Sequence, residues 1–405
     1  MTRAVLGKTP GQVPPRGTLR PEQLKRNNMG RLLTRVHLMG PTSRATLTRD
    51  LGLNRSTIGD LTSSLVDLGL VTEAGTVSTH GNGRPSHVVQ PRDDVTVIGV
   101  NLGVDRNTVA TVALGGEVLS RRERPHQRGE HDMLSVVESL GQMIEDAVRE
   151  GRDRRCLGIG VAVPGAVGLR DGVVRFAPNL GWVNAPFTAA LSSRLGMTVV
   201  CDNDAHLGAR AEHLRGVAVG RDNIAYLAGS VGVGGGFIVG GQPLTGASGY
   251  AGEIGHLSLD PDGPACRCGN AGCFETKISE NRLLTLAGRL PGGGPEAVQE
   301  VIGAACAGEE RACEALDDIS GWLALGLRSV INIFNPEMVV LGDSLALVWQ
   351  ARASEIRARL GELPLISPID HLEIVASEFG HDAPLVGAAE LAFTGLLADP
   401  AGVSS

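Results

Sequence analysis

The chain has 405 residues, of which 42% are hydrophobic and 3% aromatic, and it carries a formal net charge of −7. This length exceeds one compact domain, so two or three domains are expected. The absence of any apolar run of about 18 residues excludes a membrane span, and the first residues lack the apolar core of a signal peptide. We therefore expect a cytoplasmic protein in which clustered cysteines indicate metal binding rather than disulfides.

Charge divides the chain into a basic N-terminal part and an acidic remainder. Residues 1–93 carry 13 Lys and Arg against 6 Asp and Glu, whereas the rest carries 24 against 38. A basic segment on an acidic body indicates that only this segment meets a polyanion. Unselected variation between domains is the alternative on charge alone.

The N-terminal part begins with residues 1–19, which are rich in Pro, Gly and Thr and are predicted to form a disordered arm. Residues 20–92 are predicted to form a winged helix-turn-helix domain. A first helix runs from Pro21 to Gly40-Pro41, and Ser43 and Asn54 can cap two short helices that turn at Gly52. The segments LVTEAG and SHVVQP can pair as the wing.

The start of the second short helix is where such a domain meets base edges. The candidate DNA-binding residues are Arg44, Asn54, Arg55, Ser56, Thr57 and Asp60, with Arg84 at the wing tip suited to a narrow minor groove. A small helical protein-interaction domain is the alternative. The basic charge, the helix spacing and the wing favour DNA.

From Val95 onward, strands alternate with helices, as in VTVIGVNLGV, CLGIGVAVPGAV and NIAYLAGSVGVGGGFIVGG. This alternation predicts an α/β body, with two lobes and a cleft between them.

The body resembles the ROK (repressor, ORF, kinase) family of sugar kinases and sugar-responsive repressors. The resemblance rests on the order of VNLG, VPGAV, APNLGW, NDA, GVGGG, GEIGH, CRCGNAGC and NPEMVVLG across roughly residues 95–398. It implies an α/β protein with an N-terminal winged helix-turn-helix followed by a two-lobed, actin-like ATPase fold of the ROK sugar-kinase type. The expected first lobe is 93–203, completed by a C-terminal helix at 381–398, and the second lobe, with a zinc site, is 204–380.

The resemblance also implies a sugar site. Its residues would be Asn179, Asn203, Asp204, Glu253, His256 and Glu275. Each has a plainer alternative: Asn203 and Asp204 as a helix N-cap, Asn179 in a turn, Glu253 on the surface. In the family's kinases the carboxylate matching Asp204 is the catalytic base, and here it is expected only to hydrogen-bond the sugar.

The nucleotide motifs of the family are altered in this chain. Where the kinases have Asp-x-Gly-Gly-Thr, Gly-Thr-Gly and Gly-Gly, this chain carries the departures Asn101, Val104, Asp105, Val231 and Asp343. Lost hydroxyls and an added carboxylate oppose phosphate binding. The departures argue against ATP and Mg²⁺ binding and against catalysis.

Three cysteines and one histidine lie close together in the stretch from 256 to 273. Cys266, Cys268 and Cys273 follow His256 by 10, 12 and 17 positions. One imidazole and three thiolates complete a tetrahedron, which predicts a structural Zn²⁺ with no open position for catalysis. A reduced thiol cluster without metal is the alternative.

These features predict a cytoplasmic, sugar-responsive repressor that is not an enzyme. We expect a homodimer, or a tetramer, bound to a palindromic operator and released by a sugar or sugar phosphate. The linker 80–94 is expected to carry the coupling. An ATP-dependent hexose kinase with an added DNA-binding head is the alternative, and an activator or a sugar-independent regulator is a third possibility.

Overall fold

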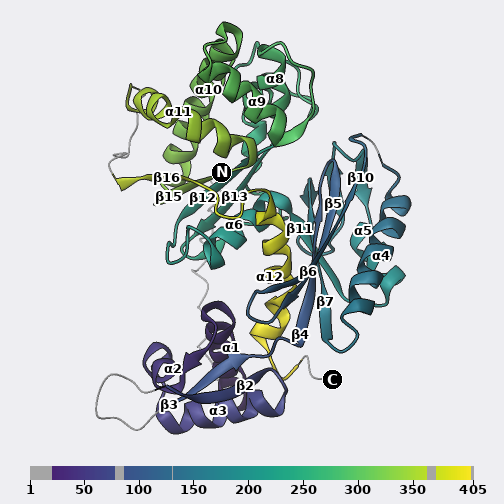
Figure 1. The fold of residues 1–405 in the computed structure, drawn as a ribbon, viewed down its shortest axis with the longest axis vertical. Helices are drawn as coiled ribbons and strands as arrows, with labels where there is room; N and C mark the ends of the chain where they lie inside the picture. The colour runs from purple at the N-terminus through teal and green to yellow at the C-terminus, as the bar shows by residue number, and fades with distance from the viewer. Residues whose placement is uncertain (1–20, 78–85, 130, 363–370, 403–405) are drawn as a thin grey trace, which may run out of the picture.

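The computed structural model describes residues 21–77, 86–129, 131–362 and 371–402 (Figure 1). Its N-terminal part, which we call the head, lies at one end of the molecule. The head is built from α1 (Pro21–Met39), β1 (Thr42–Ser43), α2 (Arg44–Leu51), α3 (Arg55–Asp67), β2 (Val71–Val77) and β3 (Ser86–Pro91). Its strands form a sheet in the order β1-β3-β2.

Local sequence signals account for the two short helices of the head. The Ser43 side chain accepts a hydrogen bond from the Thr46 N–H at the start of α2, and Asn54 accepts one from Thr57 at the start of α3. Between them, Gly52 has φ of 66°, a left-handed conformation that favours glycine. The predicted caps and turn are confirmed.

The first lobe of the body is a five-stranded sheet in the order β11-β7-β4-β5-β6. Its strands are β4 (Val95–Leu102), β5 (Arg106–Ala113), β6 (Val118–Pro125), β7 (Arg155–Val163) and β11 (Val199–Asn203). A small sheet follows β7, made of β8 (Ala166–Val167), β9 (Val174–Ala177) and β10 (Trp182–Ala185). Helices α4 (Met133–Glu150) and α5 (Phe187–Leu195) pack on one face of the large sheet, as Figure 1 shows.

The C-terminal helix α12 (Ala383–Ala398) covers the other face of this sheet. It approaches β7 so closely that a Cβ at Gly160 would lie 1.8 Å from the Ala388 carbonyl oxygen. Glycine is therefore required at this position, because any side chain would push the helix off the sheet.

The second lobe repeats the pattern around a sheet in the order β14-β13-β12-β15-β16. Its strands are β12 (Ile224–Gly229), β13 (Val233–Val239), β14 (Gln242–Pro243), β15 (Met338–Gly342) and β16 (Glu373–Ala376). Its helices are η1 (Ile254–His256), α7 (Phe274–Ile278), α8 (Glu280–Leu286), α9 (Gly294–Cys306), α10 (Glu310–Phe334), α11 (Asp343–Glu362) and η3 (Gly380–Asp382). One large apolar core joins the sheet to these helices, apart from η3. The mixed α/β, two-lobed architecture agrees with the predicted fold class.

Helix α6 (Asp204–Arg215) links the parts of the body. It begins directly after β11 of the first lobe, and it packs against α12 as well as β12 and β13 of the second lobe. At about 1.5 Å per residue, its 12 residues span about 18 Å from the cleft toward the head.

The head shares a hydrophobic core with the body. Apolar side chains of α1, such as Leu33 and Val36, belong to the same buried cluster as Val97 of β4 and Phe393 of α12. Within the described residues, no helix is both long enough and apolar enough to cross a membrane.

A buried polar network crosses the same junction. His37 of α1 lies with its Nε2 3.0 Å from Glu390 of α12, and Arg215, the last residue of α6, donates to Glu390 at 2.5 Å. The Gly115 N–H, in the turn between β5 and β6, donates to His37 Nδ1 at 3.0 Å. Burial alone would raise the pKa of Glu390, but the hydrogen bond with His37 and the hydrogen bond and charge of Arg215 outweigh it and hold that pKa at about 2.

The predicted linker 80–94 is wrong for the residues that the structure describes. Residues 86–91 form β3 and pair with β2, so only Arg92–Asp94 separate the head's last strand from β4. The side chains of Arg92 and Asp94 form an ion pair within this short connection. The head is attached by packing rather than by a flexible tether.

Candidate functional site

A cavity of about 580 Å³ lies between the two lobes. All of the residues predicted for the sugar site line it: Asn179, Asn203, Asp204, Glu253, His256 and Glu275. They come from distant parts of the chain, and the fold brings them together. Arg175, Ser230, Tyr250 and Asp343 add polar groups to the lining.

Asn203 ends β11 and caps α6. Its Oδ1 accepts from the N–H groups of Ala205 and His206 at 2.9 and 3.1 Å, and its Nδ2 donates to the Gly165 carbonyl at 3.1 Å. The N-cap alternative is therefore confirmed for Asn203. Its amide fixes the first turn of α6 and the Pro-Gly loop, so it shapes the cavity wall.

Asp204 is the first residue of α6 and is poorly hydrated. Burial, and then the charges of Asp343 and Glu253, raise its pKa to about 7. Within the described residues, its carboxylate accepts one hydrogen bond, from the neighbouring Ala205 N–H at 2.9 Å. A carboxyl group that faces a cavity with so few donors can accept a hydrogen bond from a ligand hydroxyl.

His206 was not predicted to belong to the site. Its Nδ1 lies 3.1 Å from the Asp202 carboxylate, and its Nε2 lies 2.7 Å from the Ala251 carbonyl. Burial would lower the pKa of His206, but Asp202 outweighs it and the pKa is raised. The side chain thereby ties α6 to the loop that carries Glu253, a contact that no short sequence motif predicts.

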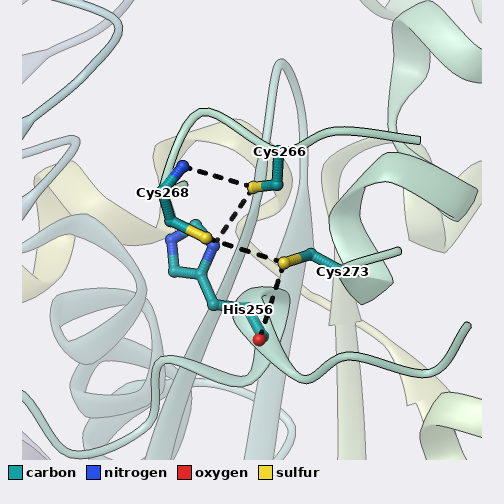
Figure 2. Close-up of side chains that lie close together, drawn as sticks. All are labelled: His256, Cys266, Cys268 and Cys273. Atoms are coloured by element: carbon teal, nitrogen blue, oxygen red, sulfur yellow. Dashed lines mark hydrogen bonds between the residues drawn. The ribbon is translucent and has the colours of Figure 1, made fainter. Parts of the chain in front are cut away.

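His256, Cys266, Cys268 and Cys273 converge as Figure 2 shows, with one ligand atom from each within 4.8 Å of the others. Cys266 Sγ lies 3.6 Å from His256 Nδ1, and Cys268 Sγ lies 3.6 Å from Cys273 Sγ. A tetrahedral zinc with bonds of about 2.3 Å to sulfur has edges of about 3.7 Å, so the donors fit such a metal in type and spacing. The cluster is compatible with a metal site.

Two side chains of this cluster, His256 and Cys268, line the cavity, and Glu275 of the cavity wall contacts the cluster. Glu275 Oε1 lies 2.9 Å from Cys266 Sγ and 3.5 Å from His256 Nδ1. On the other side of the ring, His256 Nε2 lies 3.9 Å from the Glu253 carboxylate. One edge of the imidazole faces the thiols and the other faces the cavity.

The cysteine loop also reaches the first lobe. Arg267, between two of the cysteines, donates from its Nη1 to Asn179 Oδ1 at 2.8 Å. Asn179 is therefore held by the second lobe while it lines the cavity, and the loop bridges the cleft.

A second bridge across the cleft involves Asp105, one of the altered nucleotide-motif residues. Arg128, in the segment after β6, donates to Asp105 at 3.1 Å and to Glu280 of α8 at 3.1 Å. Glu280 is buried. We call Asp105, Arg128 and Glu280 the cross-cleft bridge. Of the other altered positions, Val104 and Asp343 line the main cavity, Val231 lines a neighbouring one, and Asn101 lies in β4.

The predicted DNA-binding residues of the head differ in their surroundings. Arg55, Ser56 and Asp60 are exposed on α3, and Thr57 is half-buried. Asn54 is engaged as the cap of α3, where Ser56 Oγ also donates to its Oδ1 at 2.8 Å.

Two arginines that were predicted to bind DNA, Arg44 and Arg84, differ from the residues of α3. Arg44 forms an ion pair with Glu73 of β2, so its guanidinium joins α2 to the wing strand. Arg84 lies outside the described residues.

Comparison with known proteins gives consistent results. The family model described as "ROK family" matches residues 97–394. A putative xylose repressor of Caldicellulosiruptor sp. (strain Rt8B.4) is 31% identical over 372 residues, which cover 88% of this chain and 93% of that protein. A glucokinase of Thermotoga maritima is 31% identical over 311 residues, covering 73% of this chain and 96% of its own.

Solved structures give the same pattern of coverage. The crystal structure of a ROK family transcriptional regulator, a homologue of the Escherichia coli MLC protein, has a TM-score of 0.77 at 27% identity and covers 94% of this chain and 99% of its own. A ROK family glucokinase from Streptomyces griseus, in complex with glucose and AMPPNP, has a TM-score of 0.61 at 26% identity and covers 73% and 98%. A match that covers 94% of this chain must include the head, whereas the matches to the two glucokinases cover 73% of it and can leave the head out.

Proposed function

The chain belongs to the ROK family, and from this premise we propose that it is a sugar-responsive transcriptional repressor whose head binds operator DNA. The observation that carries the proposal is that the regulator structure matches head and body together. The cavity between the lobes, with its carboxylates, amide and imidazole, supports a sugar as the effector.

A repressor without kinase activity is favoured over a hexose kinase. In the cross-cleft bridge, Asp105 and Glu280 both bind Arg128, so this guanidinium is already neutralised. Asp343 adds a carboxylate to the cavity. Because phosphoryl transfer depends on neutralising phosphate charge, these groups oppose it.

We propose that Zn²⁺ is bound by His256, Cys266, Cys268 and Cys273 in a structural role. Four protein ligands fill a tetrahedral shell and leave no position for a catalytic water. The metal would fix the loop that carries Arg267 and the ring that faces Glu253, and so it would keep the wall of the sugar site in shape.

Sugar binding would reach the head through α6. The helix begins with Asp204 in the cavity and ends with Arg215 in the buried network with His37 and Glu390. A small shift of the first turn would be carried along a rigid helix to the junction, where α1 of the head is held. A homodimer would place two heads on a palindromic operator, and the sugar would lower operator affinity by linkage.

The test is a thermal-shift screen of sugars, followed by operator binding with and without each sugar that raises the melting temperature. We expect at least one sugar to weaken operator binding, with no turnover when ATP and Mg²⁺ are added. Turnover would establish the hexose kinase, and an operator affinity unchanged by every sugar that binds would establish a sugar-independent regulator.

Replacing Glu253 with Ala sharpens the same test. The variant should bind operator as the native protein does, and it should lose the sugar response because a cavity acceptor is missing. Glu296→Ala, on the exposed first turn of α9, is the matched control. Sugar-dependent release by the Glu253 variant would contradict the assignment of the cavity.

A further inference from the structure

The main cavity is lined by an excess of negative charge. Its acidic lining residues are Asp204, Asp343, Glu253 and Glu275, and its arginine is Arg175. Arg175 already pairs with Asp171 and donates to the Tyr250 hydroxyl at 3.2 Å. A ligand in this cavity therefore meets several carboxylates and a guanidinium that is already bound.

Among these carboxylates, Asp343 is the one whose side chain has no structural role in the fold. It follows β15 and starts α11 with φ of 50°, a left-handed conformation that is uncommon for a residue other than glycine. Within the described part of the chain, the side chain of Asp343 forms no hydrogen bond or ion pair. It neither caps its helix through its side chain nor neutralises a base, so its exposed atoms are free to meet a ligand.

The charges around Asp343 reinforce one another. Burial and the charge of Glu280 raise the pKa of Asp343 to about 6, and after burial the charge of Asp343 is the leading cause that raises the pKa of Asp204. Like charges in a poorly hydrated cleft repel strongly. A further anion placed among them would add to this repulsion.

The arginines outside the main cavity do not offset this charge. Arg128 serves both carboxylates of the cross-cleft bridge, each at 3.1 Å. Arg267 is exposed and donates to Asn179 at 2.8 Å. A phosphate group would have to displace these contacts to gain a cationic partner.

We propose that Asp343 is a specificity residue that makes the cavity select unphosphorylated sugars and reject their phosphate esters. An ionised carboxylate accepts hydrogen bonds from sugar hydroxyls but repels a phosphate dianion. This proposal rests on the proposed function, since it names the chemical class of the effector that the same cavity binds.

The test uses the full-length protein and four probes: D-glucose, D-xylose, D-glucose 6-phosphate and D-xylose 5-phosphate. Affinities are measured by titration calorimetry at pH 8 and constant ionic strength, together with operator release. At least one parent sugar should bind, and its ester should bind about 100-fold more weakly because of like-charge repulsion.

Two substitutions then assign the selectivity to Asp343. Asp343→Asn keeps the shape and tolerates the left-handed backbone, and Asp343→Gly accepts that backbone without strain. Both should narrow the difference in affinity between parent sugar and ester by about 10-fold, the size expected for the loss of one like charge. Asp146→Asn, on the exposed surface of α4, should leave it unchanged.

The outcomes separate this proposal from the function that it refines. An ester that binds as tightly as its parent and releases operator would overturn selection by Asp343 and leave the sugar-responsive repressor intact. An unchanged preference in both Asp343 variants would also overturn it. An ester that binds when its parent sugar does not would likewise overturn it, whereas an operator affinity unchanged by every sugar of the screen would contradict the proposed function itself.

Discussion

At the scale of single residues, several side chains serve two neighbours at once. Glu275 contacts Cys266 and His256 while it lines the cavity, and Asn203 caps α6 while it supports the loop at Gly165. A substitution at such a residue changes both the shape of the cavity wall and the polar groups that the cavity offers to a ligand. Variants that keep shape and remove charge are therefore the more informative ones.

Asp204→Asn should stabilise the protein in a pH-dependent way. The folded state raises the pKa of Asp204 from an ordinary 3.8 to about 7, so its ionisation opposes folding increasingly between these values. The variant should match the native protein near pH 4 and exceed its unfolding free energy by about 4 kcal/mol at pH 8. Urea unfolding at pH 4, 6 and 8 measures this difference.

The control for this experiment is Asp67→Asn, which removes an exposed carboxylate of α3. A difference between Asp204→Asn and the native protein that stays constant from pH 4 to pH 8 would be incompatible with the raised pKa.

At the scale of elements, α6 and α3 carry the two ends of the proposed response. Helix α6 starts in the cavity and ends at the head, and α3 presents an exposed first turn to solvent. Each helix can be tested by a substitution that leaves the other unchanged.

Arg215→Met should uncouple sugar binding from operator release. The substitution keeps most of the side-chain volume but leaves Glu390 with His37 alone, at a cost of about 3 kcal/mol in stability for a broken buried pair. Sugar affinity, measured by calorimetry, should stay near the native value, while operator binding responds less to sugar. Arg194→Met is the control, since Arg194 pairs with Glu138 and Glu145 away from the junction.

If the Arg215 variant released operator as completely as the native protein at saturating sugar, α6 would not be the route of coupling. Lost sugar binding would instead indicate that the substitution disturbs the cavity itself.

Arg55→Ala should weaken operator binding by about 10-fold without lowering the melting temperature, because Arg55 is exposed at the start of α3. Arg44→Ala should lower the melting temperature as well, because the ion pair with Glu73 joins α2 to β2. Fluorescence anisotropy with a labelled operator at fixed salt measures the operator affinity of the Arg55 variant. Arg289→Ala removes the same charge from the second lobe and should leave operator binding unchanged; equal affinity of the Arg55 variant would refute its role.

At the scale of the whole molecule, the proposed zinc cluster should influence more than its own loop. Chelation, or Cys268→Ser, should lower the melting temperature and weaken the sugar response together, because the loop holds Asn179 and His256 faces Glu253. Bound zinc is measured by elemental analysis beside a melting curve and a sugar titration. Cys306→Ser changes an exposed cysteine at the end of α9 and is the control; a metal-free protein with a native sugar response would separate the cluster from sensing.

The outline of the molecule could be predicted from sequence because its signals are local. Caps such as Ser43 and Asn54, and motifs in family order, mark the elements and the residues that line the cavity. Contacts between distant segments left no such signal. The pairing of Arg44 with Glu73, and of Asp105 with Arg128, depends on side chains that only the folded chain brings together.

The junction of head and body was misjudged for the same reason. The linker 80–94 was expected to carry the coupling, but residues 86–91 form β3, and the attachment of the head depends on α1 packing against α12, more than 350 residues further on. Hydrophobic periodicity identifies the buried face of a helix and not its partner.

That shared core has a consequence for protein engineering. Because Leu33 and Val36 of the head are buried in one cluster with Phe393 of α12, a head exchanged between relatives at residue 92 would lose its complementary surface. The graft should succeed only when the last turns of α12 are exchanged with it, so the unit of modularity in this protein is discontinuous in sequence.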